Sequence, residues 1–360
     1  MTALTTPSLP DSEDDADPRP LPWRRMAGVT WRQHRAALVG MAVLLGALAV
    51  WLWIVGASAH HAWAAATACR PVGSADCQDL AAAFNGTWDA MSIPAVLLQV
   101  VPALIGAFTG APVLARELET GTFRFAWTQG FGRRRWVLAK LVALATVLAA
   151  AGTAFGALVS WGFQPFSALG NQDLGLYGDS PLVGQFSLRE VTFPAWTLTA
   201  FAAGALAGML IRRVVPAIAA ALATYAGLAI AAAGLLRERY LPALVTSNPN
   251  VPGTAWIIGQ WWTKGGRFAF AGNPSPSLVG QFCNFPQSGV SKTGGGLSGA
   301  APAPAPTIQQ CLAPHGYVQW TSYQPTSRLW PFQWIEGGWL LALSVLLIAA
   351  TIWLVHRRAA

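Results

Sequence analysis

The sequence predicts an all-α membrane protein with six transmembrane helices, cytoplasmic N and C termini, and a large extracellular loop between helices five and six. Apolar residues make up 54% of the 360 residues and charged residues only 11%, whereas a soluble domain carries roughly 25% charge. Six stretches are apolar over the roughly 20 residues that a bilayer-spanning helix needs. Basic residues are concentrated in the loops on one side of the predicted membrane. This composition disfavours a soluble enzyme, a disordered chain and a coiled coil.

The chain before the first apolar stretch divides into two parts. Residues 1–22 are acidic and rich in proline, which predicts a disordered cytoplasmic tail. Residues 23–35 mix Trp with Arg and predict an amphipathic helix at the membrane interface. A plain basic flank that only orients the protein is the alternative for this second part.

The apolar stretches place five helices within residues 36–236 and the sixth, with a basic tail, within 338–360. The first stretch is too long, and begins too far along the chain, for a cleavable signal peptide. The six stretches are 36–58, 93–114, 137–163, 191–211, 214–236 and about 335–355.

The distribution of basic residues predicts which loops face the cytoplasm. The short loops on one side carry a single basic residue each, Arg70 and Arg189, so the opposite, Arg-rich side is predicted to be cytoplasmic. Arg237 and Arg239 open the 237–337 loop, and long loops cross regardless of charge. The residues on the basic side are Arg24, Arg25, Arg32, Arg35, Arg116, Arg124, Arg133, Arg134, Arg135, Arg212, Arg213, Arg357 and Arg358.

The four cysteines support the same orientation. Cys69 and Cys77 fall in the first outer loop, and Cys283 and Cys311 fall in the last. An oxidising exterior favours two disulfides within these loops, Cys69–Cys77 and Cys283–Cys311. Free thiols are the alternative, and a zinc site is disfavoured because neither pair has CxxC spacing.

The extracellular loop 237–337 holds two distinctive segments. Residues 251–262 are apolar but number only 12, too few to span a bilayer, so we expect an interfacial or re-entrant segment. Residues 294–306 are low in complexity and predict a flexible lid or linker.

The sequence offers no energy source of its own. It contains no P-loop, no GxSxG elbow and no HExxH motif. The apolar stretches have no acidic residue away from their ends, since Glu336 lies at the outer edge of the sixth, and Lys140 is near enough to the cytoplasm to snorkel. We therefore expect no catalytic residue, cofactor or metal, and an energy supply from a cytoplasmic partner.

The loop 115–136 is the place for such a partner to dock. Arg116, Glu117 and Glu119 end the second stretch. Gly121 interrupts the helix, and Thr122 can cap a new one. The residues Phe123 and Trp127 then share one face of it. A short helix with an apolar face suits docking into a groove, while an ordinary basic loop that sets topology is the alternative.

Several motifs in this part of the chain carry a family resemblance. The layout over residues 23–356 and these motifs resemble the six-span permease subunits of bacterial ABC-type exporters, the type-2 exporter class. The motifs are Arg116-Glu117-x-Glu119-x-Gly121-Thr122, Trp127-Thr128-Gln129, Arg133-Arg134-Arg135-Trp136 with Lys140, and Arg212-Arg213-x-x-Pro216-Ala217.

The resemblance implies a multi-pass protein of the bacterial cell membrane. It implies that two permease subunits, identical or paralogous, pair in the bilayer above two cytoplasmic ABC ATPase subunits. The segment around Glu117–Gln129 would be the coupling helix that docks on the ATPase. The substrate path would lie at the interface of the two permeases, with candidates Leu98, Val101, Leu104 and Tyr225.

The sequence is compatible with three functions. The first is the permease subunit of an ATP-driven exporter, which is not itself an enzyme. The second is a membrane enzyme with an extracellular active site, although Glu238, His315 and Glu336 are far apart in sequence. The third is a regulatory or immunity subunit. A nucleic-acid role is disfavoured, because the basic residues follow the membrane sides and form no single patch.

Overall fold

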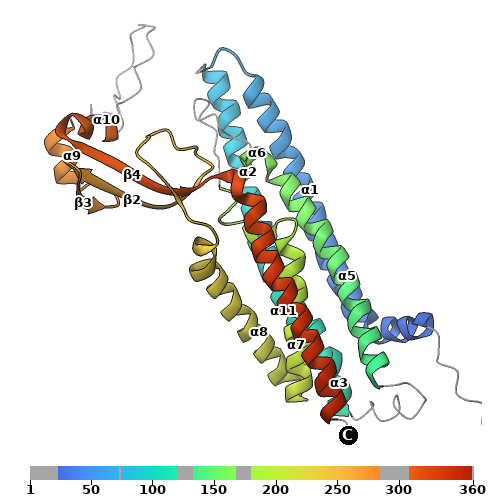
Figure 1. Cartoon of the computed structure of the whole chain (residues 1–360). Helices are drawn as coiled ribbons and strands as arrows, with labels where there is room; N and C mark the ends of the chain where they lie inside the picture. Colours follow the sequence, from blue (N-terminus) through green and yellow to red (C-terminus); the bar gives the residue numbers. More distant parts are fainter. Residues whose placement is uncertain (1–22, 73, 121–132, 168–179, 284–307, 359–360) are drawn as a thin grey trace, which may run out of the picture.

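The computed structural model describes residues 23–72, 74–120, 133–167, 180–283 and 308–358. Within these ranges the chain forms a bundle of long helices with a small antiparallel sheet at one end (Figure 1). Six helical stretches are long and apolar enough to cross a membrane, as predicted. We call the end that carries the sheet the sheet end, and the end with α3 and the C terminus the basic end.

Helices α1 (Trp23–Ala68) and α2 (Ala75–Ile105) are longer than the apolar stretches that predict them. Ser74 caps α2, since its Oγ accepts a hydrogen bond from the Cys77 amide at 3.3 Å. Residues 75–92, expected in a loop, are therefore helical. Their acidic side chains kept them outside any apolar window, although helices can extend beyond a bilayer.

Helix α2 continues into a π-helical turn, η1 (Gly106–Gly110), and then into α3 (Pro112–Thr120). Pro94 and Pro102 lie within α2, as membrane helices tolerate when neighbours compensate for the freed backbone groups. After the loop come α5 (Arg133–Gly162), the short α6 (Gln164–Ser167) and the 3₁₀ turn η3 (Phe186–Leu188).

Helix α7 (Thr192–Ile211) is the most buried of the six candidate spans. It contacts α2, α3, α5, α8 and α11. Glycines permit this crowding: a β-carbon at Gly106 would lie 2.6 Å from the Ala200 carbonyl oxygen, and one at Gly110 would lie 2.6 Å from that of Phe201. One at Gly204 would overlap the Gly106 carbonyl oxygen. Small residues four apart let membrane helices approach this closely.

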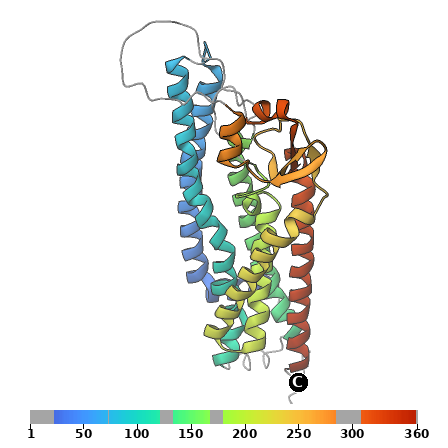
Figure 2. The same ribbon diagram turned by 90° about the vertical axis from the view of Figure 1, so that its left-hand side faces the viewer.

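Helix α8 (Val214–Ala231) follows α7 after a two-residue turn and ends in a π-helical turn, η4 (Ala232–Leu236), and the 3₁₀ turn η5 (Arg237–Arg239). The last long helix is α11 (Leu329–Arg358), preceded by η7 (Thr326–Arg328). It begins several residues before the predicted stretch of about 335–355, so Gln333 also belongs to the helix. Its C terminus and α3 lie at the same end of the bundle (Figures 1 and 2).

The sheet corrects the all-α prediction. Its strands are β1 (Leu244–Thr246), β2 (Trp256–Lys264), β3 (Arg267–Ala271) and β4 (Tyr317–Gln324), all antiparallel in the order β1-β4-β2-β3. Gly265 and Gly266 have positive φ and form the two-residue turn of the β2–β3 hairpin. The segment predicted to be interfacial or re-entrant is thus mostly strand β2, because its apolar residues pair with β4 and β3.

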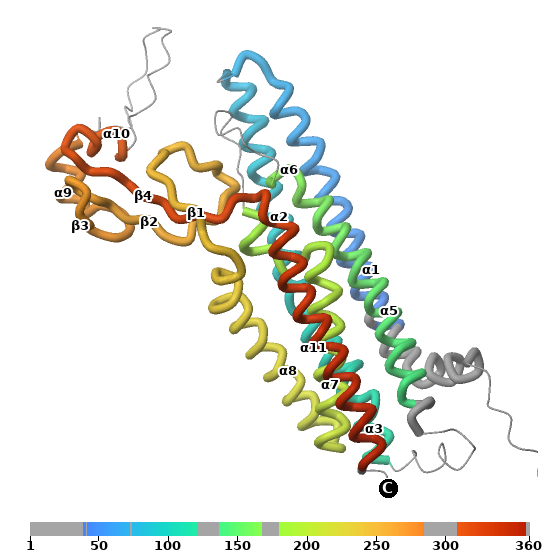
Figure 3. The backbone as a smooth tube through the Cα atoms, in the orientation of Figure 1, coloured from blue at the N-terminus to red at the C-terminus, as the bar shows by residue number. Residues whose placement is uncertain are grey.

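A small core of its own supports this sheet. Trp262 and Tyr317 pack with Leu312 and with the disulfide that joins Cys283 to Cys311. The disulfide links the short helices α9 (Pro276–Phe282) and α10 (Ile308–Leu312), which flank the stretch 284–307. The turn η6 (Ala313–His315) then leads into β4. Figure 3 shows this unit projecting beside the bundle from the adjoining ends of α8 and α11. The predicted lid or linker, 294–306, lies outside the described residues.

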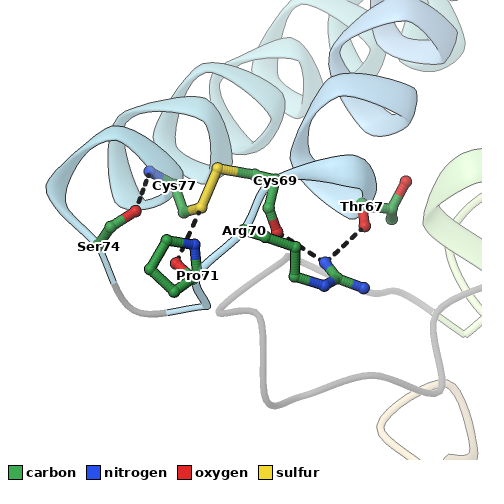
Figure 4. Close-up of a disulfide and its surroundings, with 6 residues drawn as sticks. All are labelled: Thr67, Cys69, Arg70, Pro71, Ser74 and Cys77. Atoms are coloured by element: carbon green, nitrogen blue, oxygen red, sulfur yellow. Dashed lines mark hydrogen bonds between the residues drawn. A yellow bond between two sulfur atoms is a disulfide. The ribbon is translucent and has the colours of Figure 1, made fainter.

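Both predicted disulfides are present, since Cys69 also bonds to Cys77. Figure 4 shows the Cys69–Cys77 bridge closing the turn between α1 and α2. The Arg70 guanidinium donates to the carbonyls of Thr67 and Cys69, which are left open at the end of α1 (Figure 4). Both bridges lie at the sheet end.

The glycine contacts generate a test of the core. Gly204→Ala places a methyl group against the Gly106 carbonyl, so we expect a loss of about 1–3 kcal/mol of stability, as for overpacked interiors. Thermal unfolding in detergent, monitored by size-exclusion chromatography, measures this loss of stability. Gly227→Ala in α8 is the matched control, because a β-carbon there meets no atom within 4 Å. Equal melting of the two variants would contradict the close contact of η1 and α7.

Candidate functional site

The described residues that flank the segment 121–132 form the first part of the candidate site. Arg116, Glu117 and Glu119 lie on α3, which ends at Thr120, and α5 resumes at Arg133. Gly121, Thr122, Phe123 and Trp127 lie outside the described residues, so their predicted coupling role stays a prediction. The two helices that flank this segment, α3 and α5, are among the described residues.

A buried ion pair joins the two helices. Lys140 Nζ on α5 lies 2.5 Å from Glu117 Oε1 on α3, with side-chain exposures of 3% and 13%. Lys140 therefore does not snorkel to the membrane surface as expected, because its side chain is buried against the Glu117 carboxylate. Glu117 Oε2 is also buried and has no hydrogen-bond partner in the described part of the chain. Separating the pair would remove a charge–charge contact from a low-dielectric interior, which is costly.

A second carboxylate joins α3 to α8. Glu119 Oε2 accepts a hydrogen bond from the backbone amide of Val214, at 3.0 Å. Val214 is the first residue of α8, where backbone amides lack helical partners and the helix dipole favours a negative charge. The side chain of Arg213, the N-cap residue of α8, makes no capping hydrogen bond. The end of α3 is thus attached to both α5 and α8.

A second polar cluster lies at the sheet end. The Glu336 carboxylate on α11 is fully buried and accepts hydrogen bonds from Arg237 Nε and Nη2, Trp196 Nε1 and the Tyr240 hydroxyl, at 2.9–3.2 Å. The Arg237–Glu336 pair is an ion pair of 2.9 Å. Burial, and then the nearby Glu336 carboxylate, raise the pKa of Tyr240 above its usual value, so the phenol stays protonated and can donate.

The cluster gives Glu336 a partner that its place in the sequence does not indicate. The sequence predicts Glu336 at the outer edge of the sixth span and Arg237 at the start of the 237–337 loop. In the structure the two charges balance each other. They are 99 positions apart in the chain, and no local spacing signals the pair.

A cavity of about 350 Å³ adjoins this cluster. Helices α2, α7 and α8, together with the segment 182–188 and β2, supply its walls. Tyr225, predicted on the substrate path, lines it, whereas Leu98 and Val101 are buried in the main hydrophobic core. Leu104 is partly buried and does not line it. A path role for these three leucine and valine residues stays a prediction.

No cluster of His, Cys, Asp and Glu that could hold a metal occurs among the described residues. His60, one of an adjacent pair, stacks on Trp161 and contacts its carbonyl oxygen with Nε2 at 2.9 Å. This side chain joins α1 to α5 and serves packing.

Residues 42–237 match the family model described as ABC-2 membrane transporter related. The chain belongs to this family. Membership implies a membrane transporter permease that works with an ABC ATPase partner. Searches of curated proteins and of solved structures gave no significant match.

The matched region ends at Arg237 and so covers the first five candidate spans of this ABC-2 related permease. It includes the attachments of α3 to α5 and α8 and the central helix α7. The sheet, the Cys283–Cys311 disulfide and α11 lie beyond it. Glu336 is therefore contributed to the cluster at the sheet end from outside the region that the family model describes.

The ion pair beside the 121–132 segment yields a prediction. Glu117→Gln removes the carboxylate charge that Lys140 Nζ contacts, and breaking a buried pair in this way costs about 3–5 kcal/mol. We expect a lower unfolding temperature in detergent and a loss of ATPase coupling. Asp79→Asn is the control for loss of a negative charge alone, because Asp79 is exposed on α2 and has no role in these contacts. The exchange Glu117→Lys with Lys140→Glu should restore part of the stability; if Glu117→Gln melts like the parent, the pair does not stabilise the fold.

Proposed function

We propose that this chain is the membrane-spanning permease subunit of an ATP-driven ABC exporter. It forms the substrate path, and a separate ATPase subunit hydrolyses ATP. The observation that carries the proposal is the double attachment of α3, to Lys140 of α5 and to the Val214 amide of α8. A force applied to the segment between α3 and α5 reaches three membrane helices through short, polar contacts.

The proposed orientation places the basic end in the cytoplasm of a bacterial cell and the sheet end outside. Two observations support it. The described arginines Arg116, Arg212 and Arg213 lie at the ends of spans that meet at the basic end, as positive-inside topology requires. Both disulfides lie at the opposite end, where an oxidising environment preserves them.

The contacts suggest how an ATPase acts on the path. The ATPase docks on the segment that contains Phe123 and Trp127. Its movement displaces α3, which pulls on α5 through Glu117 and on α8 through Glu119. Because α7 is held to α3 and η1 by close backbone contacts, it limits how far α3 can move. The expected motion is therefore a tilt of α5 and α8 about α7.

A second permease subunit, identical or paralogous, completes the proposed path. It packs against α8, the least buried of the candidate spans, and against the neighbouring face of α2. Large apolar side chains are exposed on both helices: Val96, Val100, Val215, Leu222 and Ile230. An interface there would place the cavity beside Tyr225 close to the path.

Docking of the ATPase is tested with the double variant Phe123→Asp, Trp127→Asp. Two buried charges at the contact should abolish co-purification of an ABC ATPase encoded beside this chain, and stop stimulation of its ATP hydrolysis. Phe268→Asp is the control, since that exposed side chain lies at the sheet end. The purified chain alone should hydrolyse no ATP. Efflux of fluorescent amphipathic dyes at the parent's rate by the double variant would overturn the docking role.

Orientation is tested with the disulfides. On intact cells, a membrane-impermeant reductant followed by an impermeant maleimide should label Cys69, Cys77, Cys283 and Cys311. Peptide mass spectrometry identifies the labelled residues. Variants with Cys77→Ser or Cys311→Ser show which bridge reacts. Labelling that requires permeabilised cells would place the sheet end in the cytoplasm and reverse the proposed orientation.

A further inference from the structure

We propose that the cavity beside Arg237 is a binding site for a zwitterionic amphipath, a molecule with a phosphate and an ammonium group on an apolar tail. The family model says nothing of such a site, and the inference does not depend on the proposed export function. It depends on the hydrogen-bonding capacity, charge and walls of the cavity.

Two donor groups at one end of the cavity have no hydrogen-bond acceptor among the described residues. Arg237 donates hydrogen bonds from Nε to Glu336, and from Nη2 to both Glu336 and Ser187. Its Nη1 makes no hydrogen bond to any residue that the structure describes, although the side chain is only 9% exposed. Ser187 Oγ accepts from Arg237, and its own hydrogen has no described acceptor. Both residues line the cavity, so a ligand there should present acceptor oxygens.

The geometry of α8 and η4 aims Arg237 at the cavity. Tyr225, Ala229, Ala233 and Arg237 all line it at intervals of four residues. Four residues exceed one α-helical turn, so such positions drift around an α-helix. The π-helical turn Ala232–Leu236 holds more residues per turn and offsets this drift. π-turns of this kind occur frequently at functional sites.

The charge balance of the site restricts the net charge of the ligand's head group. The guanidinium of Arg237 is already balanced by the fully buried Glu336 carboxylate at 2.9 Å. An anionic ligand would leave a net negative charge in a low-dielectric site, which is costly. A phosphate that carries its own ammonium group avoids this cost. The head group should therefore hold acceptor oxygens without net charge.

The walls supply a place for the ammonium group and for the tail. Trp196, Tyr225 and Trp256 contribute aromatic rings, and aromatic faces attract ammonium groups. The Trp196 and Tyr225 rings are edge to face with centroids 5.5 Å apart, so they present surfaces in two directions. Phe193, Leu182 and Pro102 provide apolar surface. A volume of about 350 Å³ is within the range of small-molecule sites, enough for a head group and the start of a chain.

The test uses the full-length chain in sugar detergent, without ATPase or nucleotide. The probe is a lysophosphocholine with a photoreactive diazirine near its head group. Mass spectrometry locates the labelled peptides. We expect labelling on the cavity segments of α7 and α8, with saturation as the probe concentration rises. Because no ATP-dependent step is involved, failure of labelling and failure of export are separate results.

Variants identify the cavity as the site. Ala229→Phe fills it and should abolish labelling, whereas Ala226→Phe, on the same helix but outside the cavity, should not. Ser187→Ala and Arg237→Lys each remove a donor and keep the charge of the Arg237–Glu336 pair; each should weaken binding about tenfold. A single size-exclusion peak at the parent's position and a cooperative thermal transition confirm that each variant is folded.

Competitors identify the head group. Unlabelled dodecylphosphocholine should displace the probe. A dodecyl sulfate of equal chain length should compete at least about tenfold more weakly, because it adds net charge. Glycerophosphocholine, the head group without a tail, should also compete weakly if the tail contributes. Labelling that survives Ala229→Phe, or stronger competition by the sulfate than by the phosphocholine, would overturn the proposal.

Discussion

Close backbone contact between α7 and the α2–η1–α3 segment is the constraint on which the rest of the bundle depends. Gly106 and Gly110 face Ala200 and Phe201, and Gly204 fits against Gly106, with no room for a β-carbon. Gly152 and Gly156 of α5 similarly admit Pro194 in the first turn of α7 and Glu190 just before that helix. Lipid tails are as apolar as leucine, so membrane helices associate mainly through such packing. Once α7 is enclosed, α5, α8 and α11 occupy fixed places around it, and polar side chains can meet across the helices.

The polar clusters at the two ends resemble one another in physical terms. Each holds one cation and one carboxylate from different helices, Lys140 with Glu117 and Arg237 with Glu336. A buried pair contributes little net stability over an apolar core, but separating it is costly. Such pairs therefore favour one arrangement of helices over alternatives. At the basic end the pair joins the helices on either side of the proposed docking segment, and at the sheet end it joins α8 to α11 beside the cavity.

A proposed function of transport fits the different packing of the spans. Helix α7 is enclosed, whereas α8 is bound to it along one side and otherwise open. Its two ends are attached by Glu119 at Val214 and by Glu336 at Arg237. A helix held at both ends but loosely covered between them can tilt without disrupting a large core. The sheet adds a separate unit with its own disulfide and small core, so it can follow α8 and α11 without unfolding.

The sequence by itself determined the class of protein, the six spans, the two disulfides and the family, because hydropathy, cysteine placement and charge in short loops are local properties. It also contains local signals of close helix packing and of the hairpin: glycines four residues apart in 106–110, 152–156 and 204–208, and the Gly265-Gly266 turn between strand-forming residues. Only the tertiary structure decided that Lys140 is buried with Glu117, that Glu119 caps α8, and that Arg237 meets Glu336 beside a cavity. These contacts join residues far apart in the chain, and their partners are chosen by helix packing, which no periodicity in a single segment encodes.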